Sequence, residues 1–232
     1  MWPYYGGKYS IAHLYPKPKH NRIIEPFAGT AQYSLIHFDN DVLLVDKWDV
    51  IIKIWKWLQQ CSKQDILGLP RLKQGERLSS LNLSEEEKLF MGFVVGQGQS
   101  PRDKASAMTT TYRPNRQNYT LRKTAEQLFK IKHWQFVNGS YECLGNTKAT
   151  WFIDPPYQHG GHVYVTGNKL DYLALGEWSK SRLGHVIVCE NTKADWLPFK
   201  PMRKMSGTMY RTVEAIWSSH THNFELQQMK LF

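Results

Sequence analysis

A short apolar run that two prolines stop constrains this chain more than any other feature. Residues 151–153 read Trp-Phe-Ile, which is typical of a buried strand, and residues 154–157 read Asp-Pro-Pro-Tyr. Prolines end a strand because they lack an amide hydrogen and fix φ. A carboxylate, a carbonyl and a ring therefore leave the strand at its carboxyl end, where ligands bind in an open α/β sheet.

These groups suit an amine that is attached to an aromatic ring. The Asp154 carboxylate and the Pro155 carbonyl can accept the two N–H bonds of the amine, and Tyr157 can stack on the ring. The alternative is an ordinary turn that begins with Asp and Pro.

A second strand end lies near the start of the chain. Ile23 and Ile24 predict a buried strand that Pro26 ends, and Gly29 permits a tight turn into a helix reaching Phe38. Strand, glycine turn and helix form the unit that holds the polar end of a nucleotide-like cofactor. An ordinary β–α turn is the alternative, because dinucleotide sites carry three glycines where this motif has one.

Two more segments carry candidate binding groups. Residues 42–46 predict a strand that ends in Asp46, about twenty residues after the first strand, the spacing at which an acid reaches ribose hydroxyls. The alternative is a solvated aspartate. Tyr5, Gly6, Gly7 and Lys8 combine a close backbone approach with a compact positive charge, and an N-terminal turn with a solvated lysine is the alternative.

The remaining strands and helices complete an α/β pattern. Residues 135–137 and 185–191 predict strands, residues 203–210 and 212–219 predict a closing β-hairpin, and helical spacing marks 51–58 and 171–182. The alternation breaks from 62 to 118. There, Ser84 begins a helix through a capping box, and the polar run from 96 to 118 predicts a mobile surface segment because it has few apolar residues. A helix over 120–132 follows, with Phe129 among its inward residues.

The charge points to a polyanion, most simply nucleic acid. The 232 residues carry 30 Lys and Arg against 20 Asp and Glu, a net charge of +10, and residues 97–134 alone contribute eight basic against two acidic residues. A basic protein without such a partner is the alternative, as is a solvated loop for this segment. Candidate phosphate and base contacts are Arg102, Arg113, Arg116, Arg122 and Lys123.

Other features exclude several classes of protein. The three cysteines form no Cys-x-x-Cys pair, so we expect neither a disulfide framework nor a zinc knuckle, and a reducing compartment is indicated. His159 and His162 lack a third ligand, so we expect no metal and read their glycine-rich loop as one that closes over substrate. No segment is apolar enough to predict a secretory signal or a membrane span.

The motifs together resemble a known family. Tyr5-Gly6-Gly7-Lys8, Glu25-Pro26-Phe27-Ala28-Gly29, a basic insertion and Asp154-Pro155-Pro156-Tyr157 follow in the order of the Dam-type DNA adenine-N6 methyltransferases. The arrangement is that of their α-group, in which the target-recognition region lies between the cofactor motif and the catalytic motif. The resemblance spans nearly the whole chain. Two positions depart from the family pattern: Ala31 stands where a second glycine is usual, and Ser140 where many relatives carry Asp.

The resemblance implies a Rossmann-like, mostly parallel seven-stranded sheet that ends in a hairpin, with S-adenosylmethionine as methyl donor. Residues 1–60 and 133–232 would form the catalytic domain, and 61–132 an inserted helical target-recognition region. Tyr5 and Lys8 match the first cofactor motif, with Lys8 at the methionine carboxylate of the cofactor. Phe27 and Gly29 match the cofactor loop, and Asp46 the ribose-binding acid.

The catalytic set that the resemblance implies is Asp154, Pro155 and Tyr157, which would hold a flipped adenine, with Asp154 also bordering the cofactor. Double-stranded DNA would be the partner, a cognate restriction endonuclease a possible second one, and the enzyme a monomer or weak dimer in the cytoplasm of a bacterial or phage-infected cell. Two alternatives stay open: a DNA-binding protein with a degenerate cofactor site, and a methyltransferase acting on cytosine-N4 or RNA.

Overall fold

The computed structural model describes residues 1–96, 98–161, 170–206 and 211–220. The strands are β1 (Arg22–Glu25), β2 (Asp41–Asp46), β3 (Gln135–Asn138), β4 (Ala149–Ile153), β5 (Gly184–Asn191), β6 (Lys200–Ser206) and β7 (Arg211–Ser218). The α-helices are α1 (Gln32–Ile36), α2 (Asp49–Gln60), α3 (Lys63–Gly68), α4 (Glu85–Gly96), α5 (Ala107–Thr110), α6 (Arg116–Gln127) and α7 (Tyr172–Lys180). Short 3-10 helices are η1 (Ala12–Leu14), η2 (Leu78–Ser80), η3 (Leu128–Ile131) and η4 (Tyr141–Cys143).

Within these residues the strands form one seven-stranded sheet in the order β3-β2-β1-β4-β5-β7-β6. The first five strands are parallel, whereas β7 runs antiparallel to both β5 and β6. The predicted Rossmann-like α/β sheet with a C-terminal antiparallel hairpin is therefore confirmed. Because the chain order reverses between β1 and β4, a crevice opens at their carboxyl ends.

Side chains alternate between the two faces of the sheet. On β4, Phe152 stacks on Tyr33 of α1 and belongs to the core cluster that also includes residues of α2, α4 and α6, whereas Trp151 and Ile153 belong to the cluster of the opposite face, with Leu175 of α7. Every residue of β4 is buried, as expected for a central parallel strand that is covered on both faces. The strand that precedes Asp154 is thus held rigidly in the centre of the protein.

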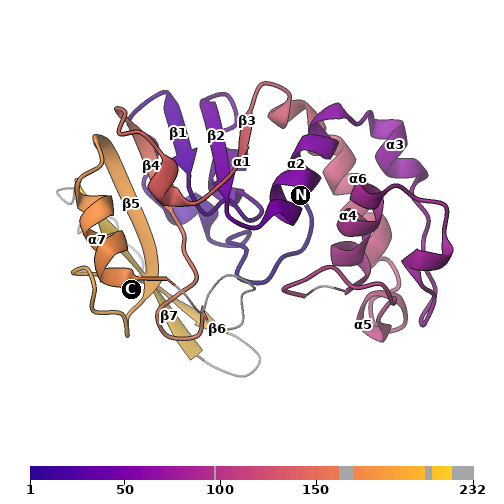
Figure 1. Ribbon diagram of the computed structural model, residues 1–232. Helices are drawn as coiled ribbons and strands as arrows, with labels where there is room; N and C mark the ends of the chain where they lie inside the picture. Colours follow the sequence, from indigo (N-terminus) through magenta and orange to yellow (C-terminus); the bar gives the residue numbers. More distant parts are fainter. Residues whose placement is uncertain (97, 162–169, 207–210, 221–232) are drawn as a thin grey trace.

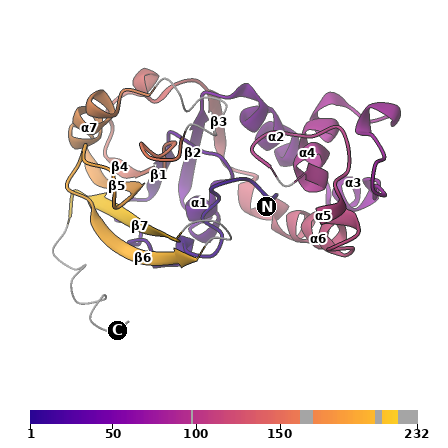
Figure 2. The same cartoon turned by 90° about the horizontal axis from the view of Figure 1, so that it is seen from below.

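The inserted helices lie beside the sheet. In Figures 1 and 2, α3 to α6 gather next to α2 at one side of the molecule, and α7 lies at the other side. Ser84 and Glu87 form the predicted capping box, since each side chain accepts a hydrogen bond from the backbone of the other. Two details differ from expectation: α1 ends at Ile36 and does not reach Phe38, and Phe129 is 57% exposed, with only its edge against Phe38.

The segment from 98 to 118 lies largely at the surface, as expected, and is anchored to the end of α4. The backbone N–H groups of Arg102 and Ser106 donate to the carbonyls of Gly92 and Val95, and the buried Thr109 hydroxyl donates to Val95 at 2.7 Å. Polar side chains thus satisfy carbonyls at the end of α4, which a helix leaves without partners. Hydrogen bonds therefore anchor the segment together with the buried side chain of Ala105, although it contains few apolar residues.

Gly92 makes this packing possible, and its replacement by alanine should loosen the segment. An added Cβ would lie 2.6 Å from the Pro101 Cβ and 2.9 Å from the Arg102 backbone nitrogen. We expect a net loss of about 1–2 kcal/mol, since overpacking exceeds the gain of about 1 kcal/mol in helix propensity. Limited proteolysis between 98 and 118 should become faster. Gly68→Ala, where nothing lies within 4 Å, is the matched control and should leave the cleavage rate unchanged.

Candidate functional site: a cavity at the carboxyl ends of β1 and β4

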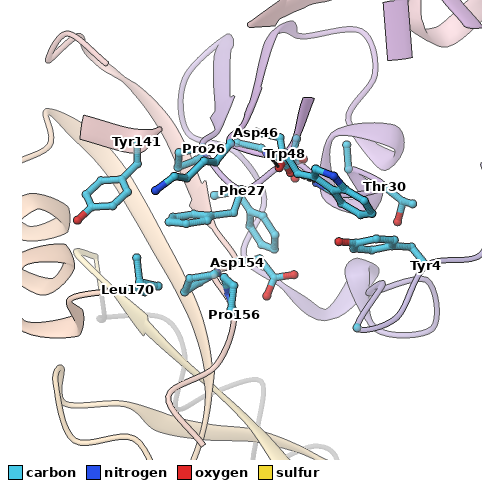
Figure 3. Close-up of a pocket in the computed structure, with 18 of the residues that line it drawn as sticks. Tyr4, Pro26, Phe27, Thr30, Asp46, Trp48, Tyr141, Asp154, Pro156 and Leu170 are labelled. Carbon is cyan, nitrogen blue, oxygen red and sulfur yellow. Dashed lines mark hydrogen bonds between the residues drawn. The ribbon is translucent and has the colours of Figure 1, made fainter. Parts of the chain in front are cut away.

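A cavity of about 330 Å³ lies where β1 and β4 end. Figure 3 shows Tyr141 and Leu170 on one side, Tyr4, Thr30 and Trp48 on the other, and the Asp154 carboxylate pointing inward between them. The lining residues used below are Tyr4, Tyr5, Lys8, Glu25, Phe27, Gly29, Ala31, Asp46, Trp48, Ser140, Tyr141, Glu142, Asp154, Pro155, Pro156 and Leu170. The strand ends predicted to meet at one edge of the sheet therefore do so.

Asp154 is the carboxylate at the centre of this site. Its side chain is 21% exposed, and its Oδ1 lies 3.0 Å from the Lys8 Nζ. Burial raises the pKa of Asp154 to about 6, the Lys8 ammonium lowers this pKa, and the Glu214 carboxylate raises it. The group is consequently a charged hydrogen-bond acceptor above about pH 6.

Asp46 fixes the turn after β1. Its two carboxylate oxygens accept hydrogen bonds from the backbone N–H groups of Gly29, at 3.0 Å, and Trp48, at 2.9 Å. Burial raises the pKa of Asp46 to about 6, and these two N–H donors act against that rise. Each carboxylate oxygen keeps a lone pair, so the group can also accept a hydrogen bond from a ligand hydroxyl in the cavity.

The turn itself has the backbone of a two-glycine loop. Gly29 has a φ of 43°, and Ala31, which stands where the Dam-type enzymes that the motifs resemble usually have glycine, also adopts the left-handed conformation with a φ of 43°. Such a conformation costs a non-glycine residue about 1–2 kcal/mol. Alanine at position 31 therefore introduces local backbone strain, and the loop keeps the conformation that glycine would adopt there.

Ser140, the second position that departs from the Dam-type sequence pattern, lies beside an acidic residue. The Ser140 hydroxyl donates a hydrogen bond to the Glu142 carboxylate, and both residues line the cavity. Next to them the rings of Phe27 and Tyr141 lie 5.6 Å apart between centres. This end of the cavity therefore offers two rings and a carboxylate, which suit a heteroaromatic group that carries an amine.

Tyr4 and Trp48 form the opposite wall, and the sequence analysis did not single them out. Both rings pack edge-on against Phe93 of the inserted helix α4, at 5.6 Å and 6.1 Å between centres. Trp48 follows the end of β2 by two residues, and this strand-end position was the available signal. Tyr5, the predicted motif residue, also lines the cavity and is 51% exposed.

Lys8 and Tyr157 lie together beside Asp154. Among the described residues that form the cavity wall, Tyr157 is not present; its hydroxyl accepts a hydrogen bond from Lys8 at 2.6 Å and donates one to Glu214 at 2.6 Å. The Lys8 ammonium points to Asp154 and Tyr157, and its contact with a cofactor carboxylate stays a prediction. Both side chains are engaged because a buried acid, Glu214, lies behind them.

Glu214 is a functional candidate that the sequence analysis missed. It lies on β7, is 5% exposed, and its Oε1 also accepts a hydrogen bond from the Tyr15 hydroxyl at 2.6 Å. The Lys8 Nζ lies 3.5 Å from the same oxygen. A charged residue within the otherwise apolar run of residues 213–217 was the signal, since an acid is seldom buried without partners.

The loop after Pro156 is held by a second buried acid. Glu190 on β5 accepts hydrogen bonds from the Gln158 backbone at 2.6 Å and from the Trp196 ring.

The residues considered for a metal site are not gathered into one. In the part of the chain that the structure describes, no three His, Cys, Asp or Glu side chains come together as a metal site. His159 belongs to that part and is exposed, whereas His162 lies outside the described residues.

The candidate DNA contacts are only partly brought together. Arg116 and Lys123 share one face of α6 with Tyr119, and Lys123 also bonds to the Tyr9 hydroxyl. Arg113 borders the same surface, in a shallow depression with Arg116 and Tyr119. Arg122 is exposed but lies about 100° around the helix from Lys123, and the exposed Arg102 packs its stem over Gly96 of α4.

Fold and site define a Rossmann-like α/β protein with a nucleotide-type cavity at the reversal of its strand order. The volume lies within the range of small-molecule sites, and two rings, a strand-end acid and a glycine turn fit a nucleoside cofactor. No helix among the described residues is long and apolar enough to cross a membrane.

Comparison with known proteins adds little to this description. No protein-family model and no curated protein matches the chain. Among solved structures, the chain is similar to "Putative methyltransferase yhhF from Escherichia coli", with 9% identity, a TM-score of 0.37 and coverage of 90% of this chain and 78% of that one. It is also similar to a conserved hypothetical protein from Streptococcus pyogenes, with 11% identity, a TM-score of 0.30 and coverage of 87% and 88%. At these TM-scores neither likeness carries an argument about the activity of this chain.

Proposed function

We propose that the protein is a DNA methyltransferase that transfers a methyl group from S-adenosylmethionine to the N6 nitrogen of adenine. The observation that carries this proposal is the Asp154 carboxylate, which enters the cavity beside Pro155 and faces the cofactor-type cradle of Phe27, Gly29 and Asp46. The order of the motifs along the chain, which resembles the Dam-type enzymes, supports the same assignment.

Asp154 acts on the electron pair of the target nitrogen. That pair is delocalised into the adenine ring, so the amine is a poor nucleophile until acceptors hold its two hydrogens and favour a pyramidal nitrogen. The Asp154 carboxylate supplies one acceptor and the Pro155 carbonyl the second. Alignment and preorganised acceptors then provide most of the rate enhancement.

S-adenosylmethionine, when bound, would supply a methyl group carried on a sulfonium. The target nitrogen would gain this methyl group and lose one of its two protons, for which the Asp154 carboxylate would be the acceptor. Asp46 would hold the ribose hydroxyls, and Phe27 with Tyr141 would contact the adenine of this cofactor. The Glu142 carboxylate, beside Ser140, would accept a hydrogen bond from the adenine amine. Tyr5 would border the opposite, polar end of the cofactor.

The basic face of α6 is the surface that we assign to DNA. Arg113, Arg116 and Lys123 meet phosphates there, and Tyr9 and Tyr119 add rings that can pack against sugars or bases. Tyr9 directly follows Lys8, so this surface continues into the segment that borders the cavity. An adenine must leave the duplex to reach Asp154, and the target is therefore flipped out of the stack.

The rivals are disfavoured by particular residues. A degenerate cofactor site was suggested by Ala31 and Ser140, yet Ala31 adopts a glycine-like conformation and Glu142 brings a carboxylate to Ser140. Cytosine-N4 relatives usually carry serine at the position of Asp154.

Transfer of tritium from labelled S-adenosylmethionine to unmethylated double-stranded DNA tests the proposal. The product is hydrolysed, and N6-methyladenine is separated from N4-methylcytosine by chromatography. RNA of similar length serves as the competing substrate. Label in N6-methyladenine is expected; binding of both cofactor and DNA without any incorporation would contradict the proposal.

Neutralising Arg113 and Arg116 together should weaken DNA binding and reduce its dependence on salt. Each lost phosphate contact lowers the slope of log affinity against log salt by about 0.9, so the double Gln variant should lose nearly two. Binding titrations at several salt concentrations measure this slope. Arg22→Gln, at the amino end of β1 where Arg22 pairs with Asp41, is the control. An unchanged slope in the double variant would place DNA on another surface.

A further inference from the structure

Lys8 already pairs with the carboxylate that the amine of a target base would need, that of Asp154. Its Nζ lies 3.0 Å from the Asp154 carboxylate, 2.6 Å from the Tyr157 hydroxyl and 4.4 Å from the centre of the Tyr157 ring. A base whose amine binds to Asp154 must therefore displace this ammonium. The side chain of Lys8 is only 10% exposed, so the displaced charge needs a partner within the protein.

Glu214 is the partner that the fold provides. Its side chain is 7% exposed and its Oε1 is 3.5 Å from the Lys8 Nζ, so a small movement transfers the ammonium from one carboxylate to the other. The hydroxyls of Tyr15 and Tyr157 donate to the same Oε1 at 2.6 Å each and hold it in place. These contacts join β7, the start of the chain and the segment after β4.

We propose that Lys8 stands in for the amino group of the target on Asp154 when the site is empty, and that Glu214 receives the Lys8 ammonium when a base enters. This inference rests on the proposed function for the identity of the base. It assigns Glu214 as a positioning residue, because it acts through Lys8 and Tyr157. The exchange keeps Asp154 charged and paired until an amine replaces the lysine, and it selects bases that carry an exocyclic amine.

The titration of Asp154 reports how strongly Lys8 and Glu214 act on it in the empty site, without any methyl transfer. Because Lys8 lowers and Glu214 raises the pKa of Asp154, Lys8→Gln should move its titration midpoint to higher pH and Glu214→Gln to lower pH, each by about one unit. The other titratable groups that face Asp154 are unchanged in both variants: Tyr15, Glu25, Tyr157 and Cys189. Carboxyl carbon NMR of aspartate-labelled protein measures the midpoint, with Asp154→Asn for signal assignment.

Glutamine at 214 keeps an oxygen that can accept hydrogen bonds from the two tyrosine hydroxyls, so the variant removes charge and conserves shape. Glu177→Gln on the surface of α7, where Glu177 pairs with Lys180, is the matched control and should leave the midpoint unchanged. Midpoints that stay at the wild-type value in both variants, or that move in the same direction, would overturn the proposal.

A second arm uses the unaltered protein and does not depend on how the variants fold. With S-adenosylhomocysteine saturating the cofactor site, adenosine should shift the Lys8 side-chain NMR signal, whereas purine riboside, which lacks the amine, should leave it in place. Adenosine that binds without moving Lys8 contradicts the exchange. If S-adenosylhomocysteine does not bind, the proposed function is contradicted. The opposite shifts of the Asp154 midpoint in the two variants then test the pairing of Lys8 independently of that function.

Discussion

Replacement of Asp154 by asparagine is expected to lower the rate of methyl transfer about 100- to 1,000-fold. Asparagine has nearly the same shape, but it loses the negative charge and presents an amide group whose N–H bonds can face the hydrogens of the target amine. Loss of one preorganised group at the reacting centre typically has an effect of this size. Single-turnover transfer of tritiated methyl groups, with cofactor and DNA both saturating, isolates this step.

The control for this variant is Asp39→Asn, which removes an exposed carboxylate between α1 and β2. It should transfer methyl groups at the wild-type rate. Circular dichroism and calorimetric binding of the cofactor establish that Asp154→Asn is folded and loaded. A folded, loaded Asp154→Asn protein with the wild-type rate would remove Asp154 from the reaction.

Gly184→Ala is expected to destabilise the protein by about 3 kcal/mol, which corresponds to a melting temperature lower by about 10 °C. Gly184 starts β5 opposite Ala149 of β4 and has a φ of 103°, which L side chains rarely adopt. An added Cβ would lie 2.2 Å from the Ala149 carbonyl oxygen. The strand that ends at Asp154 would have to shift at its first residue.

Thermal unfolding followed by calorimetry checks this expectation. Gly145→Ala is the matched control, because nothing lies within 4 Å of its added Cβ and its φ is not positive. The control should unfold within about 2 °C of the wild type. If Gly184→Ala unfolds at the same temperature as the control, β4 and β5 can separate at this end without cost.

Local patterns in the sequence predicted the sheet and the meeting of its strand ends. Ile23, Ile24 and residues 151–153 are short apolar runs that prolines terminate, and parallel strands necessarily bring their carboxyl ends to one edge. Asp46 and Asp154 could be placed there for that reason. The backbone conformation of Ala31 was not predictable, because residue type favours glycine at this angle and only the surrounding loop enforces it.

The contacts of Lys8 and Tyr157 could not be predicted from local sequence patterns, because they involve residues that are far apart in the sequence. Glu214 reaches them only because β7 inserts between β5 and β6, and its partner Tyr15 is 199 residues away in sequence. The anchoring of the segment from 98 to 118 to α4 could not be predicted for another reason. Its hydroxyl groups satisfy the end of α4, and such polar anchoring leaves no apolar periodicity to read.

The contact of Phe93 with both Tyr4 and Trp48 connects the inserted helices with the wall of the cavity. Phe93 belongs to α4, which packs against α6, the helix that carries the basic face, while Tyr4 and Trp48 form one wall of the cavity. Under the proposed function, DNA that shifts α4 would alter that wall, and a cofactor in the cavity would restrain α4. By thermodynamic reciprocity, DNA and cofactor would then change each other's dissociation constant by the same factor.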